Sequence, residues 1–268
     1  MTMQQDSQVK SEADAEVKPR GETIRAFLIA IVLALGVRAF VLEPFKIPSG
    51  SMIPTLLVGD YILVNKFAYG VRLPFTGRVI LPIGEPTRGD VVVFRYPDDP
   101  SLDFIKRVVG IPGDKIELRE GELWVNDQLV DDKPDGEYVY KEYANGGQVT
   151  ANRFIERNIE GDEYAILPLP RPVSREHREW VVPADSYFMM GDNRDNSQDS
   201  TKWRNTFVSK EQLKGRAFMV HWSWVVDGGR SEEGFIADFL HTLGKVVTFQ
   251  VDEIRWGRIG RRVDGIAD

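Results

Sequence analysis

Residues 103–114 read Asp103-Phe-Ile-Lys-Arg-Val-Val-Gly-Ile-Pro-Gly-Asp114, an apolar run with two adjacent basic residues that ends in a Pro/Gly turn. As a β-strand, the run places Phe104, Lys106 and Val108 on one face and the alternate residues on the other. Lys106 then lies between two bulky apolar side chains, on a face that we expect to be buried. Burial disfavours the charged ammonium and lowers the pKa of a lysine. The alternative interpretation is a lysine at a sheet edge whose ammonium reaches solvent.

Similar short apolar runs, separated by Pro, Gly and Asp, continue on both sides of this segment. They predict strands over 61–64, 91–96, 104–109, 187–190 and 218–222, and a hairpin of 115–118 with 123–125. Only residues 231–243 show the spacing of an amphipathic helix. The pattern predicts a mainly β fold built from antiparallel sheets.

The composition excludes several classes of function. The 268 residues include 34 Lys and Arg against 41 Asp and Glu, a formal net charge of −7 that argues against a nucleic-acid-binding protein. The absence of cysteine removes disulfides, zinc–thiolate sites, iron–sulfur clusters and cysteine nucleophiles. No metal or cofactor is expected, because the three histidines form no ligand motif: His177, His221 and His241.

The N-terminal part predicts a membrane anchor. Residues 1–25 are polar and predict a tail, whereas residues 26–42 are apolar apart from Arg38. These seventeen residues would make a helix of about 25 Å, near the roughly 30 Å of a bilayer core. The alternatives are a cleaved signal peptide and a buried core helix. A cytoplasmic N-terminus is favoured by three basic residues before the span: Lys18, Arg20 and Arg25.

The rest of the chain would then lie on the extracytoplasmic side of the membrane. We predict a β-rich core formed by residues 43–125 and 183–268. The polar, tyrosine-rich residues 126–182 between them predict a smaller β subdomain, inserted at the periphery of this core.

Directly after the predicted anchor comes Pro48-Ser-Gly-Ser-Met-Ile-Pro54, in which two prolines and a glycine predict a fixed, exposed turn. A serine on such a turn can present its hydroxyl outward, while neighbouring backbone N–H groups point at a developing oxyanion. The alternative is a linker that joins the anchor to the domain.

A third polar segment, residues 191–200, follows an apolar strand and predicts a loop held by Asx turns and ion pairs. It is also a candidate calcium loop, although it lacks the EF-hand pattern. Four side chains in it offer oxygen ligands: Asp192, Asn193, Asp195 and Asp199.

In this order, the segments resemble the bacterial type I signal peptidases, membrane-anchored serine endopeptidases that remove signal peptides from exported proteins. The resemblance implies a signal-peptidase-type β-rich catalytic domain behind a single transmembrane helix. It is carried by four boxes: Pro48–Met52, Arg88–Phe94, Ile105–Asp114 and Gly191–Ser197.

The resemblance implies a role for each matching residue. Ser51 matches the family's nucleophile, and Lys106 matches the general base that takes its proton and later activates the deacylating water. Ser49 matches the serine whose hydroxyl stabilises the oxyanion together with the Ser51 N–H. Ser197 matches the serine that hydrogen-bonds and orients the lysine.

Two carboxylates match supporting groups. Asp192 is expected to form an ion pair with Arg107, and Asp199 is expected to be structural. The family usually has an arginine two residues after this last carboxylate, but Thr201 stands there. Two basic residues nearby could take the arginine's place: Lys202 and Arg204.

The resemblance also implies the partners. The expected substrates are signal peptides with small residues one and three positions before the cut, of the Ala-x-Ala type. The expected chain is a monomer in the cytoplasmic (inner) membrane, its apolar rim resting on the lipid bilayer. Shallow apolar pockets are implied at six positions: Phe45, Ile47, Pro48, Met52, Leu56 and Ile105.

Two other functions compete with this one. The first is a catalytically inactive, membrane-anchored β module that binds exported proteins. The second is a self-cleaving Ser-Lys peptidase of the repressor type, which predicts an N-terminal DNA-binding domain where this chain has a polar tail and an apolar stretch. The arginine-rich residues 254–262 are either a contact with anionic lipid or a solvated strand end.

Overall fold

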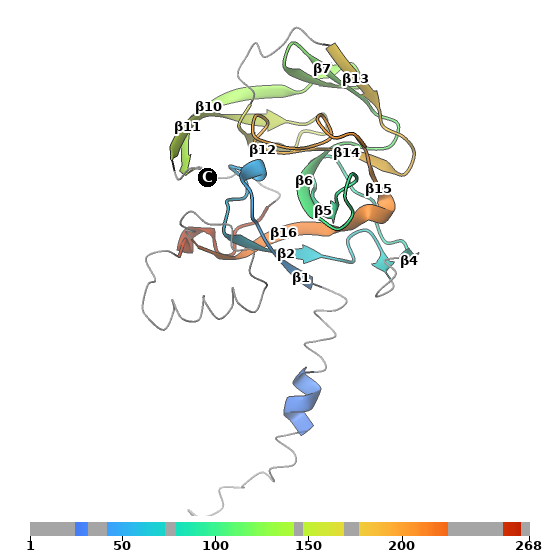
Figure 1. Ribbon diagram of the computed structural model, residues 1–268, viewed down its shortest axis with the longest axis vertical. Coiled ribbons are helices and arrows are strands. Elements are labelled where there is room, and N and C mark those ends of the chain that lie inside the picture. Colours follow the sequence, from blue (N-terminus) through green and yellow to red (C-terminus); the bar gives the residue numbers. More distant parts are fainter. Residues whose placement is uncertain are drawn as a thin grey trace, which may run out of the picture. The chain divides into compact units, whose positions relative to one another are not determined.

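A seven-stranded antiparallel sheet carries residues 103–110 near its middle (Figure 1). Its order is β1-β2-β16-β5-β6-β14-β15. The strands are β1 (Leu42–Lys46), β2 (Asp60–Asn65), β16 (Leu213–Ser223), β5 (Val91–Arg95), β6 (Asp103–Gly110), β14 (Ser186–Met190) and β15 (Val208–Ser209). The computed structural model describes residues 25–31, 42–72, 79–141, 147–168, 177–224 and 254–263.

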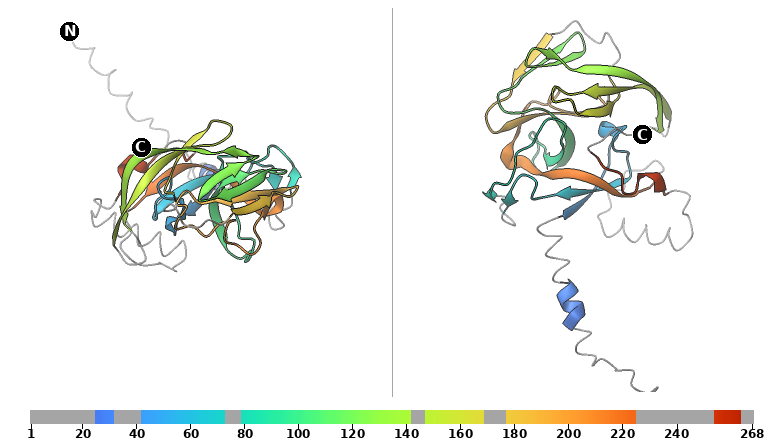
Figure 2. Two further views of the ribbon diagram at one scale, coloured as in Figure 1. Left: turned by 90° about the horizontal axis from the view of Figure 1, so that it is seen from above. Right: turned by 180° about the vertical axis from the view of Figure 1, so that it is seen from behind.

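Three smaller sheets complete the described fold. In Figures 1 and 2, β7, β13, β10 and β11 lie at one end of the β-rich unit, and β1, β2 and β4 lie at the other. One sheet pairs β13 (His177–Val181) with β7 (Lys115–Arg119), β8 (Glu122–Val125) and β9 (Gln128–Leu129). Another contains β10 (Asp131–Lys141), β11 (Gln148–Arg157) and β12 (Glu163–Ile166), and the third pairs β3 (Val71–Arg72) with β4 (Val79–Leu81). Three short 3-10 turns are η1 (Gly50–Met52), η2 (Lys210–Gln212) and η4 (Trp256–Arg258).

The strand β6 lies between two mostly buried, apolar strands, β5 and β14, and pairs with both of them. The paired strand β5 buries Val91 to Phe94, and β6 ends where the Pro/Gly turn begins. This turn is closed by the Asp114 carboxylate, which accepts a hydrogen bond from the Ile111 N–H at 2.8 Å. Gly110 is required there, because a Cβ on it would lie 2.8 Å from the Cδ1 of Ile116.

The turn that follows β1 is anchored in the hydrophobic core by its apolar side chains. Ile47, Met52 and Leu56 from this turn are fully buried in one apolar cluster with residues of β2, β5 and β6. Full burial of a side chain of this size contributes about 1.5–3 kcal/mol. The serines between these apolar residues are therefore held on a rigid support.

The predicted mainly β, antiparallel fold is confirmed, and the six predicted strand and hairpin regions correspond to β2, β5, β6, β7–β8, β14 and β16. The predicted insertion, residues 126–182, contains β9 to β13, and its last strand pairs with β7. The predicted helix at 231–243 lies outside the described residues.

The chain divides into two compact units, Met1–Ala39 and Phe40–Asp268. Of the predicted anchor, residues 26–31 are helical and residues 32–41 lie outside the described residues. Leu42, predicted to end the anchor, instead begins β1, because β2 offers it a strand partner in Asn65. In the described part of the chain, no helix has the length and hydropathy needed to cross a membrane.

Candidate active site

Ser51 lies in η1, between β1 and β2. The Ile53 N–H donates to the Gly50 carbonyl at 3.2 Å, and the Leu56 N–H donates to the Met52 carbonyl at 2.8 Å. Because Met52 is buried in the core, the turn presents the neighbouring Ser51 hydroxyl toward β6.

Lys106 of β6 contacts this hydroxyl. Its Nζ lies 2.7 Å from the Ser51 Oγ and 2.9 Å from the Ile105 carbonyl oxygen. Only 3% of the residue is exposed. Burial lowers the pKa of Lys106 to about 8, although the negative charges of Asp199 and Asp192 act in the opposite direction. The alternative of a lysine reaching solvent at a sheet edge is therefore wrong.

Ser49 stands beside the same hydroxyl, with its Oγ 3.5 Å from the Ser51 Oγ. Unlike Ser51, it is exposed. An exposed hydroxyl next to a buried nucleophile is accessible to a substrate that approaches from solvent.

Arg107 and Asp192 form a fully buried ion pair. The Arg107 Nε and Nη2 lie 2.8 and 2.6 Å from the two carboxylate oxygens, and Nη1 donates to the Gly89 carbonyl at 2.7 Å. Thr55, four residues after Ser51, donates its hydroxyl to the same carboxylate at 2.5 Å. The pair thus ties β6, the Ser51 turn and the 191–200 loop together.

The 191–200 loop also binds the backbone of the Ser51 turn. The Asn193 N–H donates to the Ser51 carbonyl, and its side-chain amide donates to the Gly50 carbonyl, both at 3.1 Å. A Cβ on Gly191 would lie 2.4 Å from the Ser51 carbonyl oxygen and 2.3 Å from the Ser197 Oγ. Only glycine fits between these two groups.

Ser197 is buried against Gly191, but the predicted hydrogen bond to Lys106 is not formed. Within the described residues, the Ser197 Oγ has no hydrogen-bond partner. The Lys106 ammonium instead directs its hydrogen bonds to the Ser51 hydroxyl and the Ile105 carbonyl oxygen.

Thr201, which stands at the position where the family usually has an arginine, contacts Asp199 directly. Its hydroxyl and N–H donate to the Asp199 Oδ1 at 2.7 and 3.1 Å, while the Gly191 N–H donates to the Oδ2 at 3.1 Å. Lys202 donates to the Ser197 carbonyl at 2.6 Å, and Arg204 pairs with Asp98. Both Thr201 bonds span two residues, the spacing of the Asx turns predicted for this loop.

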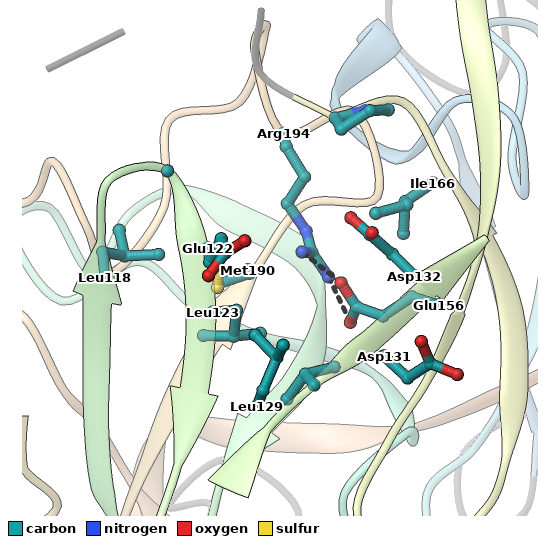
Figure 3. Close-up of a pocket in the computed structure, with 13 residues that line it drawn as sticks. Leu118, Glu122, Leu123, Leu129, Asp131, Asp132, Glu156, Ile166, Met190 and Arg194 are labelled. Carbon is teal, nitrogen blue, oxygen red and sulfur yellow. Dashed lines mark hydrogen bonds and ion pairs between the residues drawn. The ribbon is translucent and has the colours of Figure 1, made fainter. Parts of the chain in front are cut away.

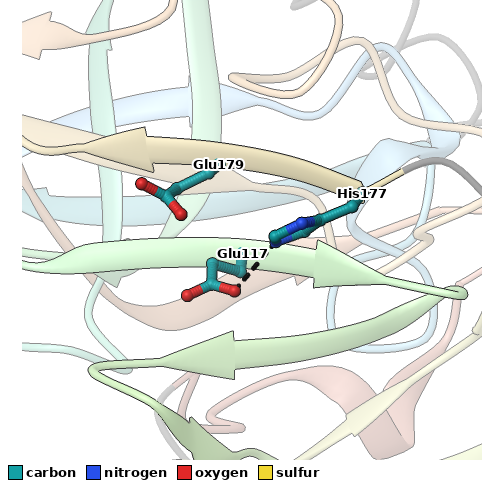
Figure 4. A group of neighbouring side chains, drawn as sticks. All are labelled: Glu117, His177 and Glu179. Carbon is teal, nitrogen blue, oxygen red and sulfur yellow. Dashed lines mark hydrogen bonds and ion pairs between the residues drawn. The ribbon is translucent and has the colours of Figure 1, made fainter.

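The calcium interpretation does not suit the loop. The oxygens of Asp192 and Asp199 accept hydrogen bonds from Arg107, Thr55, Gly191 and Thr201, so they are already occupied by protein donors. Elsewhere, Glu117, His177 and Glu179 gather on β7 and β13 (Figure 4). Hydrogen bonds from Arg119 and Lys115 hold the pKa of Glu117 well below its usual value, which identifies a salt-bridge cluster.

The six predicted pocket residues are close to the Ser51 turn but mostly covered. Five of them belong to or pack on one apolar cluster, whereas Pro48 is exposed. A cavity of about 200 Å³ is lined by none of the six. It lies behind the 191–200 loop, beside Arg194 and Glu156 (Figure 3).

Known proteins are similar to this chain over most of its length. The family model described as signal peptidase, peptidase S26, matches residues 20–222. A signal peptidase I of Pseudomonas aeruginosa is 46% identical over 209 residues, covering 75% of this chain and 72% of that protein. One of Aquifex aeolicus is 35% identical over 241 residues, covering 80% and 88%. A crystal structure of a signal peptidase I from Enterococcus faecalis is 24% identical, with a TM-score of 0.29, and covers 50% of this chain and 97% of that one. The sequence matches establish that the chain belongs to the signal peptidase family, peptidase S26.

Proposed function

We propose that the protein removes signal peptides from exported preproteins, with Ser51 as the nucleophile and Lys106 as the general base. Membership of the family makes the protein a serine endopeptidase. The observation that carries the residue assignment is the 2.7 Å distance between a buried lysine ammonium and a serine hydroxyl.

The first step is acylation. A neutral Lys106 accepts the Ser51 proton while the Oγ attacks the scissile carbonyl carbon, and the resulting ammonium then protonates the leaving amine. With a pKa of about 8, roughly a tenth of the lysine is neutral at pH 7, against less than a thousandth for an ordinary lysine. Burial therefore supplies a usable base without a histidine.

The second step is deacylation. The Lys106 amine, neutral again, takes a proton from the water that attacks the acyl carbon, and the resulting ammonium returns this proton to the Ser51 Oγ as the acyl–oxygen bond breaks. In both steps the negative charge on the carbonyl oxygen is stabilised by the Ser51 N–H and the Ser49 hydroxyl. The Arg107–Asp192 pair keeps β6 and the 191–200 loop together during the reaction.

The substrate is a preprotein with an Ala-x-Ala site. We assign six apolar positions at the Ser51 turn, of which Phe45 and Pro48 are the most exposed, to the binding of its small side chains, because shallow apolar walls exclude large or charged groups by clash and desolvation. These positions are Phe45, Ile47, Pro48, Met52, Leu56 and Ile105.

Residues 26–41 anchor the protein in the inner membrane as a monomer, with a cytoplasmic N-terminus and an extracytoplasmic catalytic domain. Three basic residues before the apolar stretch support this orientation. Protease treatment of intact spheroplasts should leave an N-terminal tag protected and degrade a C-terminal one, and the reverse pattern would invert the topology.

Cleavage of a preprotein by the full-length chain in detergent tests the dyad. The wild type should cut after the second alanine, as mass spectrometry would show, and Ser51→Ala and Lys106→Ala should be inert yet folded. A folded but inert wild type would favour the inactive binding module. If Lys106→Ala keeps its activity, another group is the base.

A further inference from the structure

A second buried ion pair lies behind the active site, between Glu156 of β11 and Arg194 of the 191–200 loop. Its two parallel contacts join Nη1 to Oε2 at 2.5 Å and Nη2 to Oε1 at 2.6 Å. The exposed fractions of the two residues are 2% and 8%. The pair borders the cavity of about 200 Å³, as Figure 3 shows.

The third guanidinium nitrogen of Arg194, Nε, contacts the 191–200 loop itself. Its Nε–H donates to the Gly191 carbonyl oxygen at 3.1 Å. The backbone adds a second connection, because Leu167 accepts from the Arg194 N–H and donates to the Asp192 carbonyl, both at 2.9 Å. Residues 191–194 are thus clamped from the side of residues 126–182.

The opposite side of the same four residues touches the nucleophile. Asn193 binds the backbone of Gly50 and Ser51, and Gly191 leaves no room for a Cβ next to the Ser51 carbonyl. Gly191 is therefore packed closely between the Ser51 backbone and the Ser197 side chain. Its position is fixed further by its own N–H, which donates to the buried Asp199 carboxylate at 3.1 Å.

Tyr164 connects the ion pair to the other half of the site. Its hydroxyl donates to the Glu156 Oε1 at 2.6 Å, and the Arg107 guanidinium carbon lies 3.9 Å from the centre of its ring. Burial raises the pKa of Tyr164, so the hydroxyl keeps its proton. Glu156 is thereby connected both to Gly191 and to the Arg107–Asp192 pair.

We propose that Glu156 and Arg194 are positioning residues for the Ser51–Lys106 dyad, acting through the Gly191 carbonyl. The proposal rests on the proposed function of that dyad. It gives residues 126–182 a catalytic purpose, because β11 supplies the carboxylate that orients Arg194. Misplacement of reacting groups by about 1 Å costs roughly 100-fold in rate.

The test uses the full-length protein and two variants that avoid a lone buried charge. The double variant Glu156→Gln with Arg194→Met removes both charges and the bond to Gly191. Arg194→Lys keeps a cation opposite Glu156 but cannot make all three contacts. The matched control is Arg157→Met with Glu163→Gln, because this neighbouring pair joins β11 and β12 at the protein surface.

We expect kcat for an Ala-x-Ala peptide to fall roughly 10- to 100-fold in the double variant, with KM within about twofold of wild type. Arg194→Lys should fall less, and the control pair should keep the wild-type kcat. A merely structural role would lower the melting temperature and leave the kcat of the folded fraction unchanged.

Wild-type kcat in the folded double variant would overturn the proposal, and so would wild-type kcat in Arg194→Lys if the double variant fails to fold. In either case an active wild type and an inert Ser51→Ala would leave the proposed function intact. An inert, folded wild type would overturn both.

Discussion

Lys106 Nζ lies 2.7 Å from Ser51 Oγ, although 55 residues separate them in the chain. The two side chains meet because β6 runs through the middle of the large sheet and η1 is fastened to the core beside it. A lysine in this position is desolvated, which lowers its pKa, and its Nζ contacts a serine hydroxyl.

The pH dependence of cleavage should follow the neutral fraction of Lys106. Because burial lowers the pKa to about 8, kcat/KM should rise about tenfold per pH unit below pH 8 and level off above it. A pH series with a fluorescent Ala-x-Ala peptide checks this. A profile that is flat from pH 6 to 9 would rule out Lys106 as the titrating base.

The same burial should appear in stability. The unfolded chain keeps Lys106 protonated up to about pH 10.4, whereas the folded protein releases this proton near pH 8. The unfolded state then binds more protons, so stability should rise with pH between these values. Urea denaturation of wild type and Lys106→Met should show a rise that is smaller in the variant. If stability rises equally with pH in the wild type and in Lys106→Met, groups other than Lys106 cause the rise.

Gly191→Ala should abolish most of the activity. The added Cβ would meet the Ser51 carbonyl oxygen at 2.4 Å and must displace the nucleophile's turn, so we expect a loss of at least roughly 100-fold in kcat. Gly257→Ala is the control, because a Cβ there meets no atom within 4 Å. An active Gly191→Ala enzyme would show that the loop can move away without cost.

Thr201→Val should destabilise the protein by about 1–3 kcal/mol, because the buried Asp199 carboxylate loses a hydroxyl donor. Thr201→Ser keeps the donor and should retain most of the stability. Thermal unfolding of both variants measures the difference. Equal melting temperatures would mean that the hydroxyl is replaceable by water.

Arg258→Met should destabilise the protein by about 3–5 kcal/mol, because it weakens the compensation of a fully buried Asp60. The same guanidinium donates to the Thr55 carbonyl at 2.9 Å, so the Ser51 turn should loosen as well. Lys133→Met removes an exposed partner of Asp131 and should change stability by less than about 1 kcal/mol. Denaturant titration compares the two, and similar small losses would contradict the structural role of Arg258.

The strands could be predicted because alternation and turn residues are local signals. Lys106 stood out for the same reason, since a charged residue between bulky apolar neighbours is visible in five residues of sequence. The order of the four sequence boxes indicated the signal peptidase family, and the family model and the relatives confirm that membership. The Ser197 bond to the lysine, inferred from resemblance alone, was wrong for this structure.

Contacts between distant segments could not be predicted in this way. Glu156 and Arg194 lie 38 residues apart, and no property of either neighbourhood marks them as partners. The Thr55–Asp192 bond spans 137 residues.

The sequence by itself therefore determined the strands, the reactive residue types and the family, because each depends on short-range pattern. Only the tertiary structure decided that Glu156 meets Arg194, that the Thr201 hydroxyl contacts Asp199 and that Gly191 has no space for a side chain. These outcomes depend on packing at close range, where a few tenths of an ångström decide whether a hydrogen bond forms or two atoms clash.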